Sequence, residues 1–113
     1  MAWVKLDDTF VEHPKVLAAG PLAAWLHVCA ISYCNRNLTD GLVPKAVASR
    51  LADVSGPAKH IASLVREGLW IEQDHEYLLH DYLEYQPSRA QVEAEREAAK
   101  KRMASSRAKV VGS

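Results

Sequence analysis

Residues 21–36 constrain the fold most, because a helix over this stretch is apolar on nearly every side. Pro21 is well placed to begin that helix. Large apolar side chains recur along it at intervals of three and four, as a helix requires: Leu22, Trp25, Leu26, Cys29 and Tyr33. Val28, Ala30 and Ile31 fill the other faces. Since a helix of this kind is buried, the rest of the 113-residue chain has to pack around it.

Prolines and glycines predict three further helices in the first 87 residues. A short one covers 15–19, after Pro14. A third begins at Pro44, with Val47 and Leu51 on its inner face, and ends before a break at 52–55. A fourth covers 57–67. Its proline lies in the first turn and a glycine ends it.

Two apolar runs predict a small β-hairpin. Residues 69–71 and 77–79 are the expected strands, and the polar residues 72–76 form the tip. Residues 42–43 predict another brief extended piece, because a following proline disfavours the helical conformation. An extended aromatic stretch is expected at 82–85.

The chain begins with a short arm at 3–10, in which Asp7 and Asp8 are expected to cap the next segment. It ends with a charged helix. Ser88 and Gln91 have the spacing of a capping box, and the residues that follow are strong helix formers.

This order of elements predicts a winged helix-turn-helix. Two short helices joined by about four residues cross the long central helix, and the hairpin closes the open side. The fold class is therefore mainly α with a small β-hairpin (α+β). We expect a winged-helix domain over residues 1–87 and a basic helical tail over 88–113.

The formal net charge is zero, but the charge is divided unevenly. Residues 1–87 carry seven basic and eleven acidic side chains, and residues 88–113 carry seven basic and three acidic ones. The body is thus acidic and the tail basic. A balanced total argues against binding of nucleic acid or membrane by bulk charge alone.

Several classes of protein are disfavoured by what the sequence lacks. It contains no long apolar run and no signal-peptide pattern at its start, which favours a cytoplasmic location. It has no nucleotide-binding or hydrolase motif, so no enzyme activity and no cofactor are expected. His27, Cys29 and Cys34 lack the convergent spacing of a zinc site, and we interpret the cysteines as core thiols.

The helix at 57–67 is the candidate recognition helix. Lys59, Ser63 and Arg66 lie at i, i+4 and i+7 on one face, and His60 is grouped with them away from the apolar side. Such residues contact phosphates and base edges in a major groove. The alternative is an ordinary solvated helix face. The hairpin tip carries Glu72, which with its acidic neighbours repels phosphates, so no DNA contact is expected there.

The tail supplies a second candidate interface. Its basic residues past the last carboxylate are Lys100, Lys101, Arg102, Arg107 and Lys109. They suit a phosphate backbone, to which each neutralised phosphate adds about 0.9 to the salt dependence. Two alternatives stay open: docking on the acidic body of another copy, and a flexible solubilising end.

Three aromatic residues predict a dimer contact: Trp3, Tyr82 and Tyr85 exceed what a small core needs. A symmetric dimer would place two recognition helices at a fixed spacing. The alternative is that these side chains pack inside one monomer.

Five segments carry a resemblance to a known family: residues 3–7 (WVKLD), 13–16 (HPKV), 38–44 (LTDGLVP), 64–70 (LVREGLW) and 80–89 (HDYLEYQPSR). With them, the chain resembles the N-terminal winged-helix region of phage replisome-organiser and DnaD-like replication-initiation proteins. The resemblance implies a winged helix that binds double-stranded DNA in the bacterial host cytoplasm, in replication initiation or in control of phage DNA. The alternatives are a dimerising adaptor that recruits a replication partner, and a transcriptional or excision regulator.

Overall fold

Prolines begin the helices of the N-terminal half, as the sequence predicts. The computed structural model describes residues 3–111 and the side chains of residues 3–105. In it, α1 (Pro14–Ala19), α2 (Pro21–Asn37) and α4 (Pro57–Arg66) each have a proline in the first turn, where no hydrogen bond is lost. A short 3-10 helix, η1 (Phe10–Glu12), precedes α1. Thr9 lies just before η1, and the carboxylate of Asp7 accepts hydrogen bonds from it.

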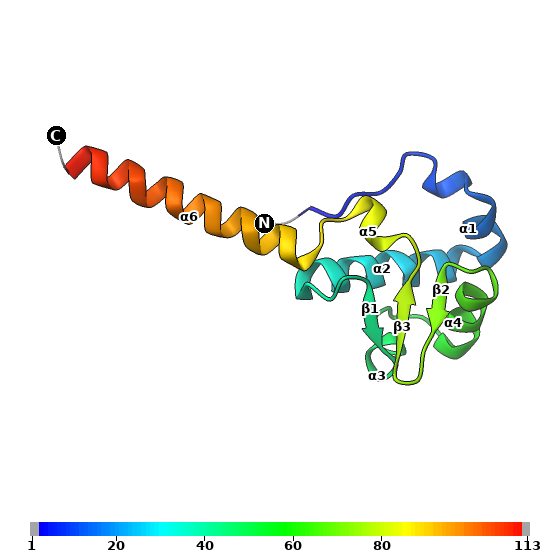
Figure 1. Cartoon of the computed structure of the whole chain (residues 1–113). Coiled ribbons are helices and arrows are strands. Elements are labelled where there is room, and N and C mark those ends of the chain that lie inside the picture. Colours follow the sequence, from blue (N-terminus) through cyan, green and yellow to red (C-terminus); the bar gives the residue numbers. More distant parts are fainter. Residues whose placement is uncertain (1–2, 112–113) are drawn as a thin grey trace.

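Helix α2 is the centre of the body (Figure 1), but part of its surface is left uncovered. Leu26, Ala30 and Cys34 are fully buried, and α1, α4 and β1 (Leu42–Pro44) pack against this side. Near the start of the helix, Leu22 is 48% exposed and Trp25 is 54% exposed. The expectation of a central, buried helix thus holds for most of α2 but not for Leu22 and Trp25, because a small body has too few elements to enclose a whole helix.

The β-structure is a three-stranded antiparallel sheet in the order β1-β3-β2. The expected hairpin is confirmed: β2 (Trp70–Glu72) pairs with β3 (Glu76–Leu79), and Trp70 lies opposite Leu79. The predicted extended piece at 42–43 is β1, in which Leu42 lies opposite Leu78 on the free edge of the hairpin. One sheet thus ties the segment after α2 to the segment after α4.

The third helix is shorter than expected. Helix α3 (Lys45–Ala48) is a single turn, and residues 49–56 connect it to α4. Leu51, which we placed on this helix, belongs to the connection and still packs partly buried against the core. The order α2, β1, α3, α4 and the β2–β3 hairpin is that of a winged helix-turn-helix.

Residues 82–85 form a helical turn, α5 (Tyr82–Tyr85), where an extended stretch was expected. Asp81 has a positive φ of 61°, which turns the chain from β3 into α5. Tyr82 then packs on Gly41, where an added Cβ would lie only 2.9 Å from Cβ of Tyr82. The extended reading is wrong because contact with this turn, rather than alternation, sets the conformation of the segment.

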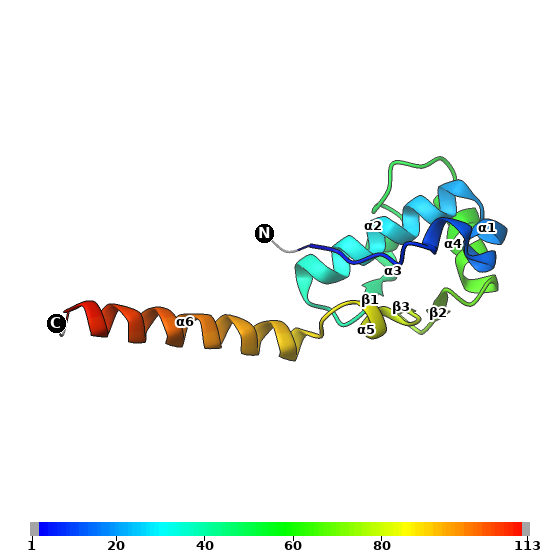
Figure 2. The same ribbon diagram turned by 90° about the horizontal axis from the view of Figure 1, so that it is seen from above.

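The C-terminal helix α6 (Arg89–Val111) projects away from the body (Figures 1 and 2). The predicted capping box is confirmed: Gln91 N–H donates to Ser88 Oγ (3.1 Å), and Ser88 N–H donates to Gln91 Oε1 (2.8 Å). The projection gives a radius of gyration of 18.0 Å, against about 13 Å for a compact chain of this length. Within the described residues, no helix has both the length and the apolar character needed to cross a membrane.

Candidate nucleic-acid interface

Helix α4 presents two of its expected cations to the surface. Lys59 is exposed, and the Arg66 side chain is 64% exposed and pairs with Glu67 at 3.1 Å. Ser63 is half-buried, and its hydroxyl donates to the carbonyl of Lys59 at 3.1 Å. These three residues share one side of the helix, as their spacing predicts. What this side offers is charge and hydrogen bonding to an anionic partner.

His60 does not belong to this surface. It is 8% exposed and buried with Ile61 and Leu64 on the inner side of α4. Its assignment as a DNA-contacting residue is therefore corrected. The physical reason is helical spacing: residues i and i+4 share a face, so His60 lies over the same side as the fully buried Leu64.

An open groove of about 620 Å³ runs between α4 and the hairpin. Ala58, Ala62 and Val65 line it from α4, and Tyr77 lines it from β3. Arg66 is the only one of the expected α4 cations that borders it. The walls of this groove are largely apolar, and Lys59 does not line it.

Lys45 is a charged residue at this groove that the sequence analysis missed. Its Nζ lies 2.9 Å from Glu72 Oε2 and 5.5 Å from the centre of the Tyr77 ring. The hydrogen bond to Glu72 raises the pKa of Lys45 above its usual value. This contact depends on how the strands pair, which no local sequence pattern indicates. Pro44 lies opposite Glu76, and this register brings Lys45 to the hairpin.

The hairpin tip, which is the wing of this fold, keeps its acidic character. Lys45 balances Glu72, and no ion pair with Asp74 or Glu76 occurs among the described side chains. The tip is fastened to α3 by a hydrogen bond from Lys45 N–H to the carbonyl of His75 (3.0 Å). A phosphate near this tip meets net negative charge.

In the tail, Lys100, Lys101 and Arg102 are exposed on α6. The side chains of Arg107 and Lys109 lie outside the described residues. Arg89 N–H donates to Asp40 Oδ1 at 2.6 Å, and this contact joins the first turn of α6 to the body. Figures 1 and 2 show the rest of α6 standing clear of the winged helix. The tail cations and the α4 cations are therefore two separate surfaces.

The three aromatic residues proposed for a dimer contact have different environments. Trp3 is 81% exposed and Tyr85 is 46% exposed, so both are accessible. Tyr82 is only 6% exposed and belongs to the core, where burial raises its pKa to about 12. The dimer role of Tyr82 is thus wrong, because this ring fills the space above Gly41.

His27, Cys29 and Cys34 do not converge. His27 bonds to Trp70, whereas the Cys34 thiol lies 3.6 Å from the carbonyl of Leu42. Burial raises the pKa of Cys34 to about 11, so this thiol is protonated at neutral pH. Across the described residues, no group of three or more His, Cys, Asp or Glu side chains is arranged to hold a metal ion.

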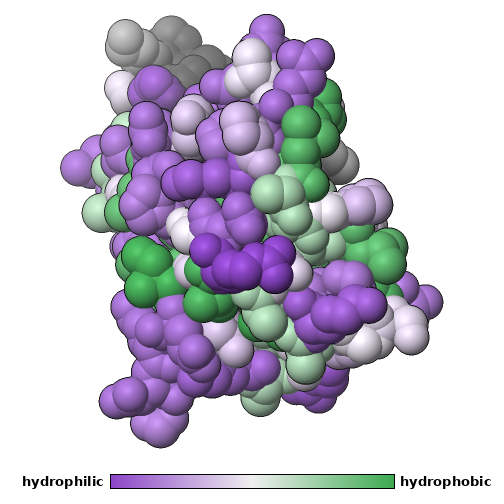
Figure 3. Space-filling view, turned by 90° about the vertical axis from the view of Figure 1, so that its right-hand side faces the viewer, coloured by the Kyte–Doolittle hydropathy of each residue, from purple (hydrophilic) through white to green (hydrophobic). Residues whose placement is uncertain are grey.

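Apolar and polar surfaces are interspersed around α4. Figure 3, which faces the end of the body that carries α1 and α4, shows hydrophobic atoms as separate patches among hydrophilic ones.

Comparison with known proteins adds nothing to this description: no family model, no curated protein and no solved structure matches the chain.

Proposed function

We propose that this chain is a non-enzymatic winged-helix protein that binds double-stranded DNA, with α4 in the major groove. The observation that carries the proposal is the joint exposure of Lys59 and Arg66 on one side of α4. In a winged helix-turn-helix, this helix is the one that reads DNA. The sequence resemblance supports a role in replication initiation or control of phage DNA, in the cytoplasm of a bacterial host.

The tail strengthens binding without reading sequence. Lys100, Lys101 and Arg102 are consecutive near the middle of α6. A helix with this charge contacts phosphates, and such contacts position a protein on DNA but carry no sequence information. Affinity and specificity are thus assigned to different surfaces, α6 and α4.

The acidic wing sets the orientation of docking. Asp74 and Glu76 at and beside its tip disfavour phosphate contact, since two like charges 4 Å apart repel by about 1 kcal/mol even in water. DNA therefore approaches α4 from the Lys59 side, across the groove from the wing.

The test is fluorescence anisotropy of a labelled duplex, titrated with the full chain at several salt concentrations. Affinity should fall steeply as salt rises, because neutralised phosphates release counterions. The double variant Lys59→Ala/Arg66→Ala should change the preference among duplex sequences. Arg36→Ala is the matched control, since Arg36 is an exposed cation near the far end of α2. An unchanged preference in the double variant would contradict the role of α4.

Truncation separates the contribution of the tail. Removing residues 99–113 should weaken binding to all duplexes by a similar factor and reduce the salt dependence by about 0.9 for each lost phosphate contact. If truncation changes sequence preference instead, the division of roles between α4 and α6 is wrong.

A protein-interaction module is the second candidate, favoured by the acidic wing together with exposed Leu17, Leu22 and Trp25 on α1 and α2. Such an adaptor dimerises or recruits a replication partner and has little affinity for DNA. Absence of binding to any duplex at low salt, with a concentration-dependent mass by light scattering, would support it over the DNA-binding proposal.

A further inference from the structure

A cavity of about 130 Å³ lies on the side of the body away from the wing tip. The N-terminal arm and η1 form one wall, the segment from Leu79 to Gln86 forms the opposite wall, and α2 forms the floor. None of the DNA-contact residues proposed above lines it. It is therefore a second site, independent of the α4 surface.

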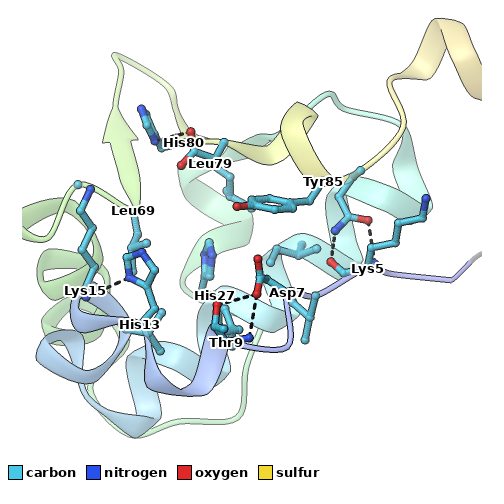
Figure 4. A pocket seen from close by; sticks show the side chains of 17 residues that line it. Lys5, Asp7, Thr9, His13, Lys15, His27, Leu69, Leu79, His80 and Tyr85 are labelled. Carbon is cyan, nitrogen blue, oxygen red and sulfur yellow. Dashed lines mark hydrogen bonds and ion pairs between the residues drawn. The ribbon is translucent and has the colours of Figure 1, made fainter.

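His27 projects from α2 into the middle of this cavity (Figure 4). It is only 7% exposed. Its Nδ1 accepts a hydrogen bond from Trp70 Nε1–H at 2.9 Å, which leaves the proton of the neutral ring on Nε2. Burial lowers the pKa of His27 to about 4, so the ring is neutral at pH 7. Among the described residues, Nε2–H has no acceptor, and this nitrogen is not fully enclosed by the chain.

The carboxylates at the cavity are each engaged at one oxygen. Asp7 accepts from the backbone N–H and the hydroxyl of Thr9, at 2.8 and 2.6 Å. Asp81 lies 2.9 Å from Nδ1 of His80. The side-chain amide of Gln86 is engaged at both ends by the backbone of Lys5. Each of these acceptor groups thus has at least one partner from the chain itself.

Two donor groups at the cavity differ in this respect. In the described part of the chain, neither the ammonium group of Lys15 nor the hydroxyl of Tyr85 has a hydrogen-bond or ion-pair partner. Figure 4 shows Tyr85 directed across the cavity above His27, and Lys15 at the opposite side. Three donors without a protein partner, of which one is cationic, border this cavity in the described part of the chain. A ligand with an anionic acceptor would supply the partner that they lack.

The remaining walls suit a flat apolar body. The Phe10 ring is stacked on His27, with centroids 5.9 Å apart and planes inclined by 16°. Ile31, Leu69 and Leu79 add aliphatic surface. The volume of about 130 Å³ is close to the roughly 150 Å³ of an apolar cavity that holds one benzene molecule. The space therefore accommodates a single six-membered ring.

We propose that this cavity binds a small single-ring carboxylate, whose ring lies between Phe10 and Leu79 and whose carboxylate accepts from His27 Nε2, Tyr85 Oη and Lys15 Nζ. The site requires no contact with DNA, so it stands or falls independently of the proposed function. Its affinity is modest, because a ligand of this size is expected to bind at about 1 mM.

The test uses benzoate as the probe and the indole signal of Trp70 as the reporter. In a ¹⁵N-labelled full chain with Trp3→Phe and Trp25→Phe, both at exposed positions, the single remaining indole N–H resonance is that of the residue bonded to His27. Benzoate at pH 7.5 should shift this resonance saturably. Benzamide, which has the same ring without the charge, should bind at least about tenfold more weakly, and inorganic phosphate should not produce the shift.

Variants of the rim assign the contacts without disturbing the core. Lys15→Met and Tyr85→Phe change exposed side chains, and each should weaken benzoate binding by about tenfold or less. Lys101→Met on α6 is the matched control and should leave the affinity unchanged. Absence of a saturable shift overturns the proposal. Equal binding of benzoate and benzamide, equal binding of phosphate, or equal loss in all three variants overturns it as well.

Discussion

The indole N–H of Trp70 donates a hydrogen bond to Nδ1 of His27 at 2.9 Å, inside the body and across 43 positions of sequence. This bond joins the first residue of β2 to the central helix α2. It connects the winged part of the molecule to the floor of the cavity below the N-terminal arm, and it determines which nitrogen of His27 carries the proton.

Loss of this bond should destabilise the protein. Trp70→Phe keeps an aromatic ring at a position that is 1% exposed, but it leaves Nδ1 of His27 buried without a donor, at a cost of about 1–3 kcal/mol. Urea unfolding measures the change. Trp25→Phe is the control: Trp25 is 54% exposed, and a surface substitution of this kind stays within about 0.5 kcal/mol. Equal effects would mean that the bond contributes nothing.

Acid should destabilise the protein through His27. The pKa of His27 is about 4 in the folded state and about 6.5 in an unfolded chain. Between these values the unfolded state binds a proton that the folded state does not, so stability is complete above pH 6.5 and falls as the pH drops towards 4. The loss is roughly 3 kcal/mol, at about 1.4 kcal/mol for each pH unit.

Urea midpoints measured from pH 7 to pH 4 test this dependence. His27→Gln, whose side-chain carbonyl is still able to accept from Trp70, should reduce the slope in this window. His75→Gln, at the exposed wing tip, serves as the control. A slope that is the same in all three proteins would place the acid sensitivity elsewhere.

Gly41 should tolerate no side chain. Its φ is +92°, and a Cβ there would lie 2.9 Å from Cβ of Tyr82. Gly41→Ala therefore combines backbone strain of about 1–2 kcal/mol with overpacking of about 1–3 kcal/mol. Gly56→Ala isolates the strain, because Gly56 also has a positive φ of +63° but open space around it. Thermal unfolding should rank Gly41→Ala as clearly the less stable variant.

The capping box should control the start of α6. Ser88→Ala removes the acceptor for Gln91 N–H, and replacement of a serine cap costs about 1 kcal/mol. Because most of α6 stands clear of the body, packing does not compensate, and the first turn should fray. Amide hydrogen exchange at residues 89–93 should accelerate, whereas Ser105→Ala, at an exposed position inside the helix, should leave it unchanged.

The sequence alone was sufficient to locate those helices whose signals lie within a few neighbouring residues. Proline in the first turn located α1, α2 and α4, and the spacing of Ser88 and Gln91 located α6. The exposure of Lys59 and Arg66 also follows from helical spacing. The same spacing identifies His60 as an inward residue, since it lies four positions before Leu64, and grouping it with the surface cations overlooked this relation.

Tertiary structure decided the elements that are only one turn long and the groups that meet from distant parts of the chain. A segment such as α3 or α5 is too short to have a readable period, so its conformation depends on the surface against which it packs, as Tyr82 does on Gly41. The side of α2 that is buried depends on how many elements are left to cover it. The cavity around His27 depends on an arm, a helix and a β-strand end that approach one another only when the chain is folded. Such long-range contacts leave no pattern in a single sequence, because nothing local requires them.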